Sequence, residues 1–412
     1  MSDSNSTIRI NPNITEIVCS LSGKEHDPQG FHRPLGLCSC CPAPGKPLLV
    51  EYDLAAVRER LGNDGWEESD GIWKYGALLP IIGLPPRYAA DVGGTTVVLH
   101  EPLSEATGVE LHLKDEGVNP SGSFKDRGLA VGVVLGAACG AQRFCLPTQG
   151  NAGVAASLFS ARLGLPGCLV YMPEGYQGNI YHREAEFFGA EVRFAGANIA
   201  ASGRMMREAF ASELESGDFV DLSTFFEPGR LEGKKTMGLE IADAFGPDGL
   251  PDWILYPTGG GTGLVGIWKA FQELIGLGRL DRDRHRLPRM VVVQSENCSP
   301  VVQAFERGLD HVEPIESKGT VADGLDVPGA IMGHGILSAV RDSKGTAVAV
   351  SEPSIIEAFR DCGRHGMAVS YESAATLAAL HKLRAERVIE EGDRVLLLLT
   401  ATHLIPLAQA AS

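Results

Sequence analysis

The chain has 412 residues, of which 44% are apolar and 21% are charged, as in globular proteins with sizeable cores. Its 36 Lys and Arg residues against 52 Asp and Glu residues give a formal charge of −16, which argues against the basic surface of a nucleic-acid-binding protein. No apolar run reaches the ~18 residues of a membrane span, and the polar N-terminus lacks the apolar core of a signal peptide. Nine cysteines in a chain of this length are too few for a disulfide scaffold, so we expect a cytoplasmic protein. The length suggests two or three domains.

The first feature in chain order is a set of cysteines. Cys19 is followed by Ser22 where a second cysteine would complete a pair, and Cys38, Cys40 and Cys41 come later. Two complete Cys-x-x-Cys pairs would predict a zinc ribbon, but here the first pair is broken. Cys40 could supply the missing ligand only through an awkward geometry. Bound zinc stays open as an alternative, but we expect a ribbon-like module that has lost its metal, and therefore no metal site.

From about residue 91, short apolar strands alternate with helical stretches. The candidate strands are Glu110–Lys114, Arg143–Leu146, Cys168–Met172, Glu191–Phe194, Trp253–Tyr256, Met290–Gln294 and Val395–Leu399. Most are nearly continuous in apolarity, which is typical of strands covered on both faces. The alternation predicts βαβ units and open parallel sheets, in which ligands bind beyond the carboxyl ends of the strands. The three motifs below all lie at such ends.

The first motif is the segment NPSGSFKDRG at 119–128, which carries Lys125 in a turn of small residues between a strand and a helix. Ser121 and Gly122 let the backbone approach a ligand closely, and Phe124 can pack and fix the direction of the lysine. A lysine amine held in this way can form a Schiff base with a carbonyl compound. The full motif disfavours the alternative of a surface lysine at the start of a polar helix.

The second motif is PTQGNAG at 147–153, which follows a strand and opens a helix. Backbone N–H groups at a helix N-terminus bind anions, so Thr148, Gln149 and Gly150 predict a site for a substrate carboxylate. Asn151 can donate a hydrogen bond to a phenolate oxygen. Taken alone, the segment is better explained as a plain helix cap.

The third motif is PTGGGTG at 257–263, followed by an apolar helix. The backbone of Gly259, Gly260, Gly261 and Gly263 can surround one phosphate, and Thr262 adds a hydroxyl. The segment lacks the Lys-Ser/Thr of a nucleotide P-loop and the spacing of a dinucleotide fingerprint. A single phosphate monoester on an otherwise apolar cofactor suits it better, although a flexible turn has the same composition.

Together, the three motifs resemble those of fold-type II pyridoxal 5'-phosphate (PLP) enzymes, and specifically of threonine synthases. The resemblance extends from about residue 17 to 400 and includes IWKYGALLP at 72–80 and EGKKTMG at 232–238. It implies an α/β fold with two open, mainly parallel βα domains, the cofactor in the cleft between them, and a small degenerate zinc-ribbon-like N-terminal module. The implied parts are the N-terminal module at 1–90, a large PLP-binding domain at 91–128 and 236–412, and a small α/β domain at 129–235.

The resemblance also implies roles for single residues. Lys125 corresponds to the Schiff-base lysine and later general base, Asn151 to the partner of the phenolate oxygen, and Gly259–Thr262 to the phosphate loop. Thr400 corresponds to the hydroxyl residue that faces the pyridine nitrogen, with a turn-capping threonine as the alternative. Arg230 corresponds to an arginine that binds a substrate phosphate, with a surface salt bridge as the alternative. Lys234 could serve the same anion, but we expect a solvated lysine.

Two departures from the family concern the substrate. Phe225 and Phe226 stand where many threonine synthases have small polar residues, which removes hydrogen-bond donors near Arg230. After Thr400 the chain continues with an unusual turn that contains His403, which we expect to be a turn residue and not a catalytic group.

The implied activity is γ-elimination and β-addition of water on O-phosphohomoserine, which gives threonine and phosphate. The alternative is β-elimination or β-replacement on serine, threonine or a β-substituted amino acid. A third possibility, a PLP-binding protein without activity, is disfavoured by the intact lysine, asparagine and glycine motifs. We expect a small-molecule amino acid as substrate, neither nucleic acid nor membrane as partner, and a homodimer by analogy with the fold.

Overall fold

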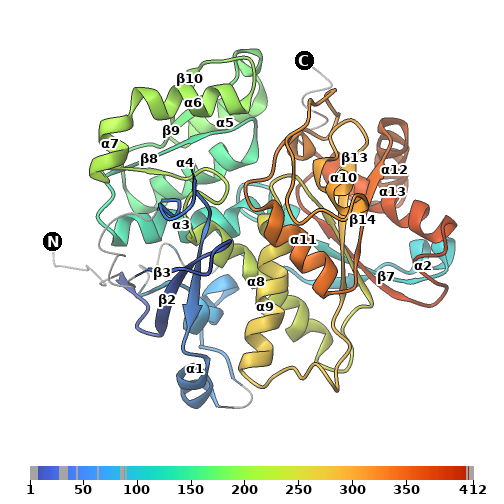
Figure 1. The fold of residues 1–412 in the computed structure, drawn as a ribbon. Helices are drawn as coiled ribbons and strands as arrows, with labels where there is room; N and C mark the ends of the chain where they lie inside the picture. The colour runs from blue at the N-terminus through green and yellow to red at the C-terminus, as the bar shows by residue number, and fades with distance from the viewer. Residues whose placement is uncertain are drawn as a thin grey trace. The chain divides into compact units, whose positions relative to one another are not determined.

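The computed structural model describes residues 8–26, 36–42, 45–62, 65–83, 88, 91–404 and 407. The chain groups into two compact units (Figure 1). Unit 1 comprises residues 1–94 and 125–236, and unit 2 comprises residues 95–124 and 237–412. One passage between the units is the peptide bond from Phe124 to Lys125. The division into three parts implied by the sequence stays a prediction.

The N-terminal part of unit 1 contains two small antiparallel sheets. In the first, β2 (Ile14–Cys19) lies between β3 (Glu25–His26) and β4 (Leu48–Tyr52); in the second, β1 (Arg9–Ile10) pairs with β5 (Ile81–Ile82). Buried and half-buried residues alternate along β4, so one of its faces packs against the unit. Two helical segments follow β4: α1 (Leu54–Leu61) and η2 (Gly71–Leu78).

The rest of unit 1 is built on a four-stranded parallel sheet in the order β10-β9-β8-β11. Its strands are β8 (Arg143–Pro147), β9 (Leu169–Met172), β10 (Glu191–Phe194) and β11 (Phe219–Asp221). Its helices are α3 (Lys125–Ala138), α4 (Asn151–Leu163), α5 (Ile180–Phe187), α6 (Ile199–Ala209), α7 (Ala211–Ser216) and the first half of α8 (Gly229–Phe245), with the short η5 (Glu174–Tyr176).

Unit 2 contains a six-stranded sheet in the order β14-β13-β12-β15-β7-β6, parallel except for the edge strand β6. Its strands are β6 (Val97–Leu99), β7 (Glu110–Asp115), β12 (Trp253–Pro257), β13 (Arg289–Ser295), β14 (Thr346–Val350) and β15 (Arg394–Leu399). Its helices are α2 (Glu101–Thr107), α9 (Thr262–Gly276), α10 (Pro300–Glu306), α11 (Gly333–Asp342), α12 (Glu352–Arg364) and α13 (Tyr371–Ala385), with the short η4 (Glu116–Val118) and η6 (Asp323–Leu325).

The unit 2 sheet is covered on both faces. Alternate residues of its strands, such as Val291 and Leu397, pack in one cluster with the apolar faces of α12 and α13. The residues between them, such as Val292 and Leu396, are equally buried. The predicted parallel α/β fold with doubly covered strands is therefore confirmed. Among the described residues, no helix is long and apolar enough to cross a membrane.

In unit 1, the start of α3 packs closely against the start of α8 through two glycines. A Cβ atom on Gly233 would lie 1.9 Å from the backbone oxygen of Arg127, and one on Gly128 would lie 2.8 Å from that of Arg230. Arg127 also donates from Nη1 to Thr236 Oγ1 at 3.0 Å. The NPSGSFKDRG and EGKKTMG motifs therefore meet here, because only glycine lets the two backbones come this close.

Gly233→Ala is expected to lower stability by about 1–3 kcal/mol, because backbone atoms in the way cannot move aside as a flexible side chain can. Gly363→Ala in α12 is the matched control, since nothing lies within 4 Å of a Cβ atom there. It should be neutral, or stabilising by up to about 1 kcal/mol through helix propensity. Thermal unfolding midpoints measure both; equal midpoints for the two variants would contradict the close approach.

Candidate active site

The turn that precedes Lys125 is paired with the chain that follows β15. Within unit 2, Phe124 N donates to Thr400 O at 2.9 Å, and Thr402 N donates to Gly122 O at 3.0 Å. Thr400 is 4% exposed, and its own amide donates to Ser373 Oγ, in α13, at 2.8 Å. The end of the last strand therefore lies beside the residue that directly precedes Lys125.

A buried polar network in unit 2 supports the same turn. Lys114 Nζ, at the end of β7, donates to Glu240 Oε2 at 2.6 Å and to Thr95 Oγ1 at 2.7 Å. Thr95 Oγ1 in turn donates to Glu116 Oε1 at 2.7 Å, and the other oxygen of Glu116 accepts from Asn119 Nδ2 at 2.9 Å. Asn119 is the first residue of the lysine motif, so the network fixes where the turn begins. The network was not predicted, because β7 also contains Glu110, His112 and Asp115, so the sequence does not single out Lys114.

The glycine loop joins β12 to α9. Gly261 adopts a left-handed conformation with φ 77°, and a Cβ atom there would lie 2.2 Å from Ile336 Cδ1. A Cβ atom on Gly263 would lie 2.0 Å from Tyr256 Oη. Burial raises the pKa of Tyr256 well above its usual value, and its ring contacts that of Phe124 edge-on, with centroids 6.2 Å apart. The loop thus leads into the positive N-terminal end of a 15-residue helix, where a phosphate is favoured.

In unit 1, the second motif forms the turn between β8 and α4. The Thr148 hydroxyl accepts from Gly150 N at 3.1 Å, so it is partly used within the turn itself. Gln149 Nε2 lies 3.3 Å from Tyr176 Oη. Asn151, the first residue of α4, has a buried Oδ1 atom without a hydrogen-bond partner among the described residues. Rotation of the side-chain amide exchanges its oxygen and nitrogen, so Asn151 can either accept a hydrogen bond from a bound group or donate one to it.

A buried cationic group lies at the start of α8 in unit 1. Arg230 is 2% exposed and donates from Nη1 to Leu222 O at 2.5 Å, while its Nε has no partner among the described residues. Burial lowers the pKa of Arg230 to about 10 and raises that of the neighbouring Glu227 to about 7. Burial, followed by the charges of Arg230 and Lys125, lowers the pKa of Lys234 well below its usual value. The alternative of a surface salt bridge for Arg230 and the expectation of a solvated Lys234 are therefore both wrong.

The loop between β11 and α8, which leads to Arg230, is strained. Phe225 is buried and has φ 67°, a left-handed conformation that costs a bulky residue about 1–3 kcal/mol. The ring of Phe226 lies 4.1 Å from the guanidinium carbon of Arg207, which also pairs with Asp221 at 2.7 Å. Backbone strain of this kind is common at functional sites. The sequence showed that two phenylalanines are unusual here, but it did not show the strain.

The turn after Thr400 contains the histidine singled out in the sequence. His403 is half-buried, and its Nδ1 lies 3.2 Å from Thr402 Oγ1. The turn is anchored to the lysine motif through the amide of Thr402. His403 therefore belongs to the chain that packs against the lysine turn.

Each unit by itself brings together some of the residues singled out in the sequence. Unit 2 brings Phe124 next to Thr400 and to the Tyr256 ring that borders the glycine loop, and in unit 1 the charges of Lys125 and Arg230 both act on Lys234. These residues fit PLP for two reasons. The buried Asn151 oxygen lacks a partner among the described residues, and at Gly261 the glycine loop leaves no space for a side chain.

Comparisons with known proteins agree with these features. Threonine synthase of Methanocaldococcus jannaschii is 29% identical over 94% of this chain and 92% of that protein. Threonine synthase of Methanosarcina acetivorans is 33% identical over 87% of this chain and 85% of that protein. Among solved structures, threonine deaminase of T.th. (TM-score 0.61, 25% identity) covers 75% of this chain and 92% of its own. Maize serine racemase (TM-score 0.64, 19% identity) covers 77% and 91%, respectively, and shows the fold alone.

The sequence pattern described as pyridoxal-phosphate dependent enzyme matches residues 88–401, which include the lysine, asparagine and glycine motifs and Thr400. The match spans most of the chain, and both units contribute residues to it. The chain therefore belongs to the family of pyridoxal-phosphate dependent enzymes, and its cofactor is PLP.

Proposed function

We propose that the protein catalyses a threonine synthase-type reaction, in which O-phosphohomoserine loses its γ-phosphate and water adds at Cβ to give threonine and phosphate. The observation that carries the proposal is the buried guanidinium of Arg230, whose Nε has no partner among the described residues. Lys234 is also buried, one helical turn further along α8. At this spacing the Arg230 guanidinium and the Lys234 amine share one helix face, and a phosphate dianion bound there would favour the protonated form of that amine. The similarity to threonine synthases supports the same substrate.

Residues from four motifs would hold the cofactor. Lys125 would bind it covalently through Nζ, Asn151 would face its phenolate oxygen, the Gly259–Thr262 loop would bind its phosphate, and Thr400 would face the pyridine nitrogen. When bound, PLP withdraws electrons from Cα of the substrate and makes the Cα proton acidic. A hydroxyl does not keep the pyridine nitrogen protonated as a carboxylate does, so Thr400 favours elimination and replacement over transamination.

The remaining steps fall to the chain's own side chains. Lys125 Nζ would be the general base that takes the Cα proton of the substrate. Ser121 and the backbone amides of residues 148–150 would hold the substrate carboxylate at the start of α4. Arg230 and Lys234 would bind the γ-phosphate and stabilise it as it leaves. Burial strengthens this interaction, because fewer water molecules screen the charges.

The direct test is to incubate the purified enzyme with PLP and O-phosphohomoserine and to measure threonine and phosphate. Equal amounts of the two products are expected, and a lack of both would refute the proposal.

Arg230→Lys keeps the positive charge but loses the planar fork that binds phosphate. We expect kcat/KM for O-phosphohomoserine to fall roughly 10–100-fold, the range for losing a hydrogen bond to a charged group. Arg207→Lys is the control, because Arg207 pairs with Asp221 and stacks on Phe226 in the preceding loop. Equal losses in the two variants would argue against phosphate binding by Arg230, provided that the visible absorption of the cofactor is unchanged in both.

A second function is favoured by the strained loop before Arg230. Phe225 and Phe226 offer no hydrogen bonds to a phosphate, and both rings are engaged in packing or with Arg207. β-elimination or β-replacement on serine, threonine or a β-substituted amino acid needs no phosphate site. Release of keto acid and ammonia from these amino acids, with O-phosphohomoserine inert, would select this function instead.

A further inference from the structure

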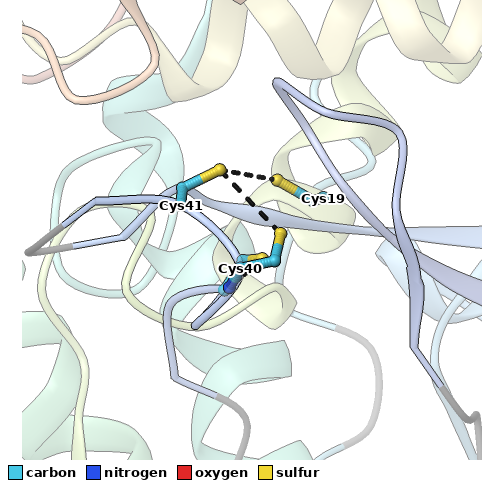
Figure 2. A group of neighbouring side chains, drawn as sticks. Cys19, Cys40 and Cys41 are labelled. Carbon is cyan, nitrogen blue, oxygen red and sulfur yellow. Dashed lines mark hydrogen bonds between the residues drawn. The ribbon is translucent and has the colours of Figure 1, made fainter.

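Four cysteine thiols converge in the N-terminal part of unit 1. Cys19 ends β2, while Cys38, Cys40 and Cys41 lie in the segment 36–42. All four sulfur atoms lie within 4.8 Å of one another. Figure 2 shows Cys19, Cys40 and Cys41 directed toward a common point, with Sγ–Sγ distances of 3.5 Å from Cys41 to Cys19 and 3.9 Å from Cys41 to Cys40.

The Sγ–Sγ distances match those between the ligands of one metal ion. A zinc ion with Zn–S bonds of about 2.3 Å in a tetrahedral site holds its sulfur atoms about 3.8 Å apart. A disulfide would need a separation of about 2.05 Å, and all four cysteines are free thiols. The sulfur atoms therefore surround a point instead of forming pairs.

The surroundings of the thiols also suit thiolate ligands. Cys40 N donates to Cys38 Sγ at 3.3 Å, and His26 Nε2 lies 3.3 Å from the same sulfur. N–H groups around a metal-bound sulfur orient it and disperse its charge, as is usual for the outer shell of metal sites. Cys19 and Cys38 are buried, whereas Cys40 is exposed, so the site has both a packed base and a path for an ion to enter.

We propose that Cys19, Cys38, Cys40 and Cys41 bind a structural zinc ion. Thiolate is the ligand that a closed zinc site favours, and four protein ligands leave no open position for catalysis. The ion would join the end of β2 to the segment 36–42 and so stabilise the small sheet formed by the short strands β3, β2 and β4. From the sequence we expected no metal, because Ser22 breaks the first Cys-x-x-Cys pair. In the structure, the adjacent Cys40 and Cys41 both reach the cluster, which the spacing did not reveal.

Metal analysis of the full-length enzyme tests the proposal. We expect about one zinc per chain after purification, and Co²⁺ exchanged for zinc should give the sulfur-to-cobalt absorption of a tetrahedral thiolate site. Cys40→Ser should lower zinc affinity at least 10-fold, whereas the control Cys139→Ser, at a cysteine outside the cluster, should keep its zinc. A wild-type enzyme without metal, iron in place of zinc, or equal zinc in both variants would each overturn the proposal.

A rescue variant makes the test specific to this site. Ser22 Oγ lies 3.3 Å from Cys40 Sγ, so Ser22→Cys places a new thiol where that of Cys40 is lost. The double variant Ser22→Cys/Cys40→Ser should therefore regain zinc. If the variants do not fold, zinc release from the wild type during stepwise thiol modification by a mercurial gives the same answer. Release should be complete once four thiols have reacted; no release, or release unrelated to thiol modification, would refute the site.

Discussion

Lys125→Ala is expected to abolish turnover and the visible absorption of the bound cofactor while leaving the fold intact. Lys125 is the first residue of α3 and is half-buried, so its truncation removes little packing. It would remove both the covalent attachment of PLP and the general base. The loss of the base alone typically slows a reaction roughly 10²–10⁴-fold, so we expect kcat to fall at least about 10³-fold.

The conservative partner is Lys125→Arg, which keeps a cation at the start of α3 but has no amine that can form a Schiff base. Both variants should lose the cofactor's visible absorption and activity to a similar degree, with unchanged far-ultraviolet circular dichroism. If Lys125→Ala kept that absorption, another lysine would hold the cofactor, and the roles assigned to the lysine motif would be wrong. If Lys125→Arg retained activity, a charge would suffice and covalent attachment would not be required.

The central strands could be predicted because their sequences are almost entirely apolar, as expected for strands buried on both faces. β15, for example, is a run of leucines buried on both sides, and β12 and β13 are equally apolar. The strands that were missed lack this signal. β11 has three residues, β6 is an antiparallel edge strand with exposed side chains, and β14 contains two alanines. Their pairing depends on neighbours that the local sequence does not specify.

The motifs of the site were recognisable, but their environment was not. Arg230 and Lys234 are four residues apart, but neither the helix α8 that places them on one face nor their burial was predicted. The pairing of Phe124 with Thr400 joins residues 276 positions apart and depends on the course of the whole sheet. The cysteine cluster likewise depends on how segment 36–42 folds back on β2, which Cys-x-x-Cys spacing does not describe.

Lys114 and Glu240 form the buried ion pair of unit 2 with the largest expected effect on stability. Their side chains are 0% and 5% exposed, and Nζ lies 2.6 Å from Oε2. Lys114→Met should lower the free energy of unfolding by about 3–5 kcal/mol, because Glu240 would stay buried without its counter-charge. Denaturant unfolding followed by circular dichroism measures the change. The control is Arg307→Met, which breaks an exposed pair with the same 2.6 Å separation and should leave the midpoint nearly unchanged.

The double variant Lys114→Met/Glu240→Leu separates the cost of an unpaired charge from the value of the pair itself. If desolvation of a lone charge dominates, the double variant should be more stable than Lys114→Met, since two apolar groups of similar volume can replace a buried pair at little cost. The affinity for the cofactor, in contrast, should stay as low in the double variant as in Lys114→Met, even though stability recovers. Lys114 also donates to Thr95, which holds Glu116 and through it Asn119, so the lysine turn stays loosened even when the charge is removed. Parallel recovery of stability and cofactor affinity would mean that the network supports the fold alone.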